Sequence, residues 1–251
     1  MKYLSVLLLL GITLLGCNKD PEKGSLTLDF TATYGDEALV LLQSYLTPEG
    51  HQIQFSKSDF YISNVYLIAE NGDRLDLSPV EFVDLTSVST SAADAANGFK
   101  ITFPDIEAGK YTRLGFGIGL DPTVNATQPA DYPSSNPLSL ESHYWTAWGS
   151  YIFSKTEGFL DTLGTGNLDL GFVFHTGMDD LYRQAYVDVP ININATATTS
   201  IQVNIDHETI LFKAGNALDI PASPVNHNPN NLGPITKIID NLVSALSVQV
   251  Q

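Results

Sequence analysis

The sequence predicts an all-β protein, an antiparallel β-sandwich of the immunoglobulin-like kind with a short C-terminal helix. Three observations support this class. Short β-branched or aromatic segments recur along the chain with turn residues between them, they do not alternate with helical segments, and no internal repeat is apparent. We therefore expect one sandwich domain over residues 25–251.

The strands are predicted from alternating apolar and polar residues. Leu26, Leu28 and Phe30 are separated by polar residues, as in a strand with one buried face. Asn71-Gly72 lies between two such segments and predicts a tight hairpin. The expected strands are residues 25–31, 53–55, 60–67, 75–77, 81–85, 101–103, 111–120, 168–174, 186–193 and 200–205.

Helical signals are few and come mostly from the C-terminal region. Prolines and asparagines fill residues 219–234 and predict a long irregular loop. Apolar residues at helical spacing follow in residues 235–246, so we expect a helix there that covers one end of the sheets. Residues 36–42 and 94–98 fit short helical turns.

The N-terminus has the features of a bacterial secretion signal. A short basic start at Lys2 precedes an apolar run that is too short to span a bilayer, which predicts a signal peptide over residues 1–16. Small residues before Cys17 resemble a lipobox, so we expect Cys17 to be lipidated and residues 17–24 to form a tether. This predicts a protein of the bacterial cell envelope, anchored to a membrane through lipid at the periplasmic or outer-membrane surface.

Composition excludes several classes of function. The chain carries a formal net charge of −16, which argues against nucleic acid as a partner. Because Cys17 is the only cysteine, the mature domain has no disulfide and no thiolate metal ligand. No nucleophile elbow, P-loop or H-E-x-x-H motif is present, so we expect a protein that is not an enzyme.

The glycines of residues 115–119 are a structural signal. Gly115, Gly117 and Gly119 alternate in LGFGIGLD, which superficially resembles a dinucleotide-binding turn. No helix signal follows them, however, and Asp121-Pro122 does. We interpret this segment as a strand that another backbone or a bulky ring approaches closely.

Residues 142–158 contain both tryptophans, Trp145 and Trp148. If the segment is extended, His143 and Trp145 share one face and are close enough to line one small site. His175 ends a predicted strand at the rim of a sheet, and His227 lies in the proline and asparagine loop, where packing gives no reason for a histidine. Imidazoles without thiolates suit copper(II), zinc or nickel.

Several blocks in order resemble the MbnP-like family, relatives of a methanobactin-associated periplasmic copper protein. These blocks are residues 55–65, 108–112, 115–121 with Asn125 after them, 155–158 and 174–177. The resemblance implies an extracytoplasmic copper-binding β-sandwich. In characterised relatives a partner di-haem, peroxidase-like enzyme oxidises a tryptophan to kynurenine, whose amine joins histidines as a copper ligand.

By this resemblance, Trp145 takes the position of the first tryptophan in the family's Met-x-Trp-x-Trp block, and His175 that of the histidine in its His-x-Gly block. The chain departs from the pattern at two positions. His143 stands at the usual methionine and Ala147 at the second tryptophan, while Trp148 is displaced by one residue. In a regular strand that displacement turns Trp148 to the opposite face unless a bulge intervenes.

The leading hypothesis is a lipoprotein that binds copper at the rim of the sandwich, in copper uptake or homeostasis, with no organic cofactor. Its expected ligands are His175, His143 and His227, and Trp145 is the candidate for modification. The alternative is a metal-free module at the cell surface that binds a glycan or a protein. It would use exposed Tyr144, Trp148 and Tyr151 as a platform. A third interpretation is a structural or adhesion sandwich without a ligand.

Overall fold

The computed structural model describes residues 21–228 and 230–251. The predicted signal peptide, residues 1–16, and the predicted lipidation site, Cys17, lie outside the described residues. Within the described part of the chain, no helix is long and apolar enough to cross a membrane.

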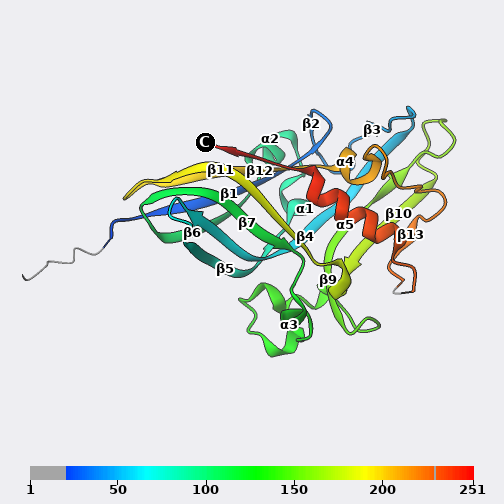
Figure 1. Cartoon of the computed structure of the whole chain (residues 1–251). Coiled ribbons are helices and arrows are strands. Elements are labelled where there is room, and N and C mark those ends of the chain that lie inside the picture. Colours follow the sequence, from blue (N-terminus) through cyan, green and yellow to red (C-terminus); the bar gives the residue numbers. More distant parts are fainter. Residues whose placement is uncertain (1–20, 229) are drawn as a thin grey trace, which may run out of the picture.

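Two β-sheets pack face to face around the main core, which confirms the predicted all-β sandwich (Figure 1). The smaller sheet has the order β14-β12-β1-β2, and β6 also pairs with β1. Its strands are β1 (Lys23–Tyr34), β2 (Glu37–Ala38), β6 (Phe99–Glu107), β12 (Thr198–Asp206) and β14 (Leu246–Val250). Leucine, isoleucine, valine and phenylalanine side chains alternate inward from both sheets and make up most of this core.

The larger sheet has the order β11-β7-β4-β9-β10-β13, with β3 and β5 paired to β4 and β8 paired to β9. Its strands are β3 (Tyr45–Leu46), β4 (Gln52–Ala69), β5 (Arg74–Val83), β7 (Gly109–Ile118), β8 (Tyr144–Trp145), β9 (Ser150–Leu160), β10 (Leu170–Gly177), β11 (Arg183–Ile193) and β13 (Val225–Asn226). β9 therefore lies between β4 and β10.

The sequence predicted an antiparallel sandwich, but two of the strand pairs are parallel. β1 pairs with β12 in parallel from Ser25–Thr198 onward, and β10 pairs with β13 in parallel. Parallel neighbours need a long connection, and both pairs join segments that are far apart in the chain. Alternation of apolar residues reports which face of a strand is buried and carries no information on strand direction.

β4 is one continuous strand of 18 residues, where the sequence predicted two segments separated by the polar residues 56–59. Ser58 and Asp59 are buried in this stretch, and each has a histidine partner. His207 contacts Ser58 Oγ at 2.8 Å, and His143 contacts Asp59 Oδ1 at 2.9 Å. Partners supplied by distant segments thus allow a polar run to continue as a buried strand.

Three local predictions are confirmed and one is wrong. The helical turn expected at residues 94–98 corresponds to the helix α2 (Ala92–Asn97). The Asn71-Gly72 hairpin joins β4 to β5, and Gly72 adopts a φ of 91°. In β7, a Cβ on Gly115 or Gly117 would lie within 2.5 Å of the ring of Tyr66 or Tyr182, so these glycines do admit bulky rings. Residues 36–42 contain β2 and irregular backbone instead of a helical turn.

The helices are short except for the predicted C-terminal one. α5 (Gly233–Ala245) buries Ile235, Ile238, Ile239 and Leu242 and packs on α4 (Figure 1). The chain then continues directly into β14, an edge strand that the sequence did not predict. The other helices are α1 (Leu85–Val88), α2 (Ala92–Asn97), α3 (Pro122–Asn125) and α4 (His207–Phe212).

His207 makes the stability of the fold depend on pH. Burial lowers the pKa of His207 to about 4, from an ordinary value of 6.5. The unfolded chain therefore takes up a proton near pH 6.5 that the folded chain does not accept until about pH 4. The folded state keeps the full contribution of neutral His207 above pH 6.5. As the pH falls from 6.5 toward 4, the free energy of unfolding decreases by about 3 kcal/mol.

We expect His207→Gln to flatten this dependence, because it removes the titrating group. Urea unfolding at several pH values between 6.5 and 4 measures the effect as the difference in slope between wild type and variant. His51→Gln is the matched control, since His51 is only half-buried and contacts the Asp161 carbonyl at a loop. Equal slopes for wild type and His207→Gln would contradict the assignment.

Candidate metal centre

A tight hairpin brings the two tryptophans together. β8 and β9 pair through Trp145 and Ser150, and the amides of Trp148 and Gly149 both donate to the Trp145 carbonyl oxygen at 2.9 Å. Gly149 closes the turn with a φ of 66°, a conformation that favours glycine. The Trp145 and Trp148 rings consequently stack with centroids 5.0 Å apart and an angle of 17° between their planes. The expectation for a regular strand, in which Trp148 faces away, fails because Trp148 lies in the turn.

His175 and His227 lie beside Trp145. The Trp145 ring centroid is 4.3 Å from that of His227 and 6.2 Å from that of His175. The two imidazole centroids are 6.2 Å apart. Backbone pairing explains this neighbourhood: β13 adds to β10 in parallel, with Val225 opposite Val173 and Asn226 opposite Phe174. The residues that follow Phe174 and Asn226 in the chain are His175 and His227.

Both histidines have a buried nitrogen without a hydrogen-bond partner. Nδ1 of His175 and Nδ1 of His227 are each inaccessible to solvent and unpaired. An unsatisfied buried polar atom costs about 1–3 kcal/mol, so two in one cluster call for an explanation such as a ligand. Burial, and then the proximity of His175, lower the pKa of His227 below its ordinary value. This favours the neutral imidazole, the form that binds a metal ion.

The opposite nitrogen of His175 has a partner. Nε2 of His175 lies 2.8 Å from Oε1 of Glu157 on β9. This hydrogen bond, together with the charges of His175, Lys57 and Lys155, lowers the pKa of the Glu157 carboxyl against the opposing effect of burial. Glu157 is therefore an anion, and it accepts a hydrogen bond from the Nε2–H group of His175.

The donor set fits a metal ion in part. Nδ1 of His175 and Nδ1 of His227 lack protein partners within one cluster of aromatic rings, and imidazole nitrogens suit copper, zinc or nickel. Within residues 21–228 and 230–251, however, no three side chains of histidine, cysteine, aspartate or glutamate are placed to hold one ion. The unmodified indole of Trp145 has an N–H donor and no lone pair to add.

His143, the third expected ligand, is not part of this cluster. It is buried, with Nε2 at 2.9 Å from Asp59 Oδ1 and Nδ1 at 3.1 Å from Ser142 Oγ. Its ring packs edge-on against Phe82 and Tyr61. Residues Glu141–His143 form a 3-10 turn, so the alternation that would place His143 on the same face as Trp145 does not apply.

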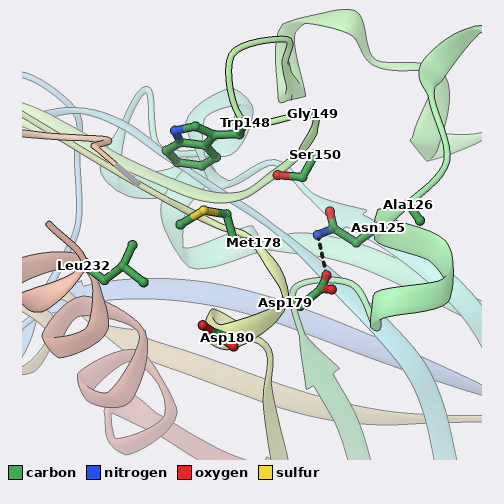
Figure 2. Close-up of a pocket in the computed structure, with 9 residues that line it drawn as sticks. All are labelled: Asn125, Ala126, Trp148, Gly149, Ser150, Met178, Asp179, Asp180 and Leu232. Atoms are coloured by element: carbon green, nitrogen blue, oxygen red, sulfur yellow. Dashed lines mark hydrogen bonds between the residues drawn. The ribbon is translucent and has the colours of Figure 1, made fainter. Parts of the chain in front are cut away.

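Trp148 borders a pocket of about 480 Å³ (Figure 2). Trp148 and Met178 line one side of the pocket, and Asn125 and Asp179 line the other (Figure 2). The side-chain amide of Asn125 donates to Asp179 Oδ1 at 2.8 Å. The Trp148 indole nitrogen donates to the His227 carbonyl oxygen at 2.8 Å, which ties the tryptophan pair to the histidine loop. The pocket leaves one side of Trp148 open to approach.

Two residues that sequence reasoning did not single out individually complete the centre. Glu157 contacts Nε2 of His175, and Gly177 makes room for Trp148. A Cβ on Gly177 would lie 2.3 Å from the Trp148 ring and 2.6 Å from the Tyr151 carbonyl oxygen. Both belong to short blocks, residues 155–158 and 174–177, that carried the family resemblance, which was the only signal for them in the sequence.

The three aromatic side chains expected for a binding platform do not form one. Tyr151 is fully buried and its hydroxyl donates to the Leu138 carbonyl oxygen. Tyr144 is half-buried and packs edge-on against Tyr151. Trp148 is half-buried and stacks on Trp145. These positions do not favour the glycan- or protein-binding alternative.

Comparisons with known proteins agree with the fold and the blocks. The family model described as MbnP matches residues 23–231. The solved structure of MbnP from Methylosinus trichosporium is similar with a TM-score of 0.60 and 10% sequence identity, over 91% of this chain and 99% of that chain. None of the curated proteins matches the sequence significantly.

We expect Gly177→Ala to disrupt the centre, because neither the Trp148 ring nor the Tyr151 backbone leaves room for a Cβ. Overpacking of this kind costs about 1–3 kcal/mol. Near-ultraviolet circular dichroism should show loss of the stacked tryptophan signal, and urea unfolding should show the lower stability. Gly171→Ala on the same strand is the control, since its Cβ would meet no atom closer than 3.9 Å. If the two variants behave alike, the proposed packing is wrong.

Proposed function

The chain belongs to the MbnP family, and on this premise we propose that it is a non-enzymatic protein that binds copper outside the cytoplasm. The proposed ligands are Nδ1 of His175, Nδ1 of His227 and an amine formed from Trp145. One observation carries the proposal: the two buried and unpartnered Nδ1 atoms belong to the two histidines whose rings border Trp145. The ligand set omits His143, because both of its ring nitrogens are in hydrogen bonds.

Oxidation of Trp145 would supply the missing third ligand. In this reaction two oxygen atoms add at C2 and C3 of the indole, the bond between these carbons breaks, and hydrolysis removes C2 as formate. The product, kynurenine, is an aryl ketone with a primary aromatic amine, whose nitrogen has a lone pair. The oxygen atoms and oxidising equivalents would come from two molecules of hydrogen peroxide, each reduced to water, through a di-haem, peroxidase-like partner. Trp145 is half-buried, so part of its side chain is accessible.

The proposed location follows from the N-terminal sequence. We infer that residues 1–16 direct secretion and that lipid on Cys17 anchors the protein to a membrane, at the periplasmic or outer-membrane surface. The role would be copper uptake or homeostasis, without an organic cofactor. Net negative charge suits capture of a cation and disfavours nucleic acid as a partner.

The ligand assignment predicts which histidines matter for copper. His175→Ala and His227→Ala should each weaken Cu(II) binding by more than about tenfold, or ~1.4 kcal/mol, because each removes one of few ligands. Competition titration of the mature protein against a copper chelator measures this. His51→Ala is the control, since its Nδ1 is in a hydrogen bond to the Asp161 carbonyl oxygen. Copper affinity that survives both cluster substitutions would refute the assignment.

The modification of Trp145 can be tested separately. Protein isolated from its native host should show, by intact mass and peptide mapping, conversion of Trp145 to kynurenine. Trp145→Phe should abolish the mass change. Trp148→Phe should leave Trp145 as the only residue converted, since the ring of Trp145 is the one next to both histidines. Conversion of Trp148 in place of Trp145, or an unmodified native protein, would contradict this part of the proposal.

A further inference from the structure

We propose that Glu157 is a positioning residue that fixes the tautomer and ring orientation of His175, so that Nδ1 is the nitrogen offered to a ligand. The consequence for copper rests on the proposed function above. The tautomer itself is a property of the metal-free chain and can be measured without any metal.

The sheet places Glu157 against only one side of the His175 ring. In the β9–β10 pairing, Glu157 lies opposite Val173 and Lys155 lies opposite His175, so Glu157 and His175 are diagonal neighbours on one face. The diagonal contact joins Oε1 of Glu157 to Nε2 of His175 at 2.8 Å. Nδ1 is left without a protein partner, in the cluster of Trp145 and His227.

Two lysines are neighbours of Glu157 in the sheet. Lys57 on β4 lies directly opposite Glu157 in the β4–β9 pairing, and Lys155 precedes Glu157 by two residues on the same face of β9. Lys155 is itself buried and fixed by donating to the Ser142 carbonyl oxygen at 2.7 Å. Lys57 Nζ lies 3.4 Å from Asp59 Oδ2, so the two lysines contribute positive charge on this face, which favours the ionised form of Glu157.

An ionised carboxylate can accept a hydrogen bond but cannot donate one. In neutral His175 the single ring proton must therefore sit on Nε2, and the lone pair must sit on Nδ1. With the other tautomer, Nδ1 would carry a proton toward Trp145 and His227, and Nε2 and Glu157 would face each other with lone pairs. A carboxylate in this position also makes a coordinating imidazole more basic.

The chain offers an internal control. His143 and Asp59 of the neighbouring strand β4 form a second histidine–carboxylate pair, which is buried, through Nε2 and Oδ1 at 2.9 Å. Both ring nitrogens of His143 are in hydrogen bonds, whereas only Nε2 of His175 is. The unpartnered nitrogen distinguishes the pair at the candidate centre from the pair elsewhere in the sheet.

The test uses metal-free mature protein with ¹⁵N-labelled histidine at about pH 8, where an ordinary imidazole is neutral. Long-range ¹H–¹⁵N correlation spectra identify the tautomer of each ring. We expect wild-type His175 to be entirely the Nε2–H tautomer, and Glu157→Leu to populate both tautomers. Glu157→Gln keeps the side-chain size and adds a donor, so it should also mix tautomers if the leucine variant fails to fold. Asp59→Asn should change the His143 signals and leave those of His175 as in wild type.

Cu(II) titration of the same proteins provides the second measurement. Loss of Glu157 should weaken Cu(II) binding by about 10–100-fold, the range for a residue that orients a ligand. An Nδ1–H tautomer in wild type, an unchanged tautomer without Glu157, or an equal effect of Asp59→Asn on His175 would overturn the inference. If wild-type protein does not bind Cu(II), the proposed function fails, while the tautomer result still decides the role of Glu157.

Discussion

Backbone pairing of β9 with β4 on one side and β10 on the other is the constraint on which the candidate centre depends. β9 begins at the hairpin that stacks Trp145 on Trp148, and it carries Lys155 and Glu157 further along. β10 carries His175 in register with Lys155. Because side chains alternate along a strand, this register places the charged and coordinating groups on the face that is turned away from the main core. A slip of one residue would move all of them into the hydrophobic interior.

The face that results is unusually polar for a buried surface. Asp59, Lys155 and His143 are buried, and each has an oppositely charged or hydrogen-bonding neighbour. Breaking such a pair leaves an uncompensated charge and is strongly destabilising, whereas an intact pair approximately balances its own desolvation. The network therefore specifies one arrangement of the strands more than it adds to stability. Glu157 lies on the same face and contacts Nε2 of His175.

The centre is completed by two segments outside this three-strand unit. The short strand β13 brings His227 alongside His175, and the β8–β9 hairpin places Trp145 next to both imidazoles. Gly177 allows the Trp148 ring to approach the backbone, and Trp148 in turn holds the His227 loop through its indole nitrogen. The histidines and tryptophans are thus fixed to each other by packing before any ligand binds, which lowers the entropy cost of binding. The pocket beside Trp148 leaves that side chain accessible from one side.

The sequence by itself determined the fold class, the C-terminal helix, the Asn71-Gly72 hairpin and the close approach of rings to Gly115 and Gly117. These features depend on local patterns, namely alternation, helical spacing, turn chemistry and the absence of a Cβ. The sequence also pointed to Trp145, His175 and His227, partly through family blocks and partly because His227 had no packing reason in its loop.

Only the tertiary structure decided which histidines meet. His143 is two residues from Trp145, yet a 3-10 turn directs it to Asp59, while His227, far along the chain, reaches Trp145 through parallel pairing of β13. The tertiary structure also decided that Trp148 stacks on Trp145 and that Glu157 contacts His175. Such contacts depend on strand order and register between distant segments, and a periodic pattern in one segment carries no information about its neighbours in a sheet.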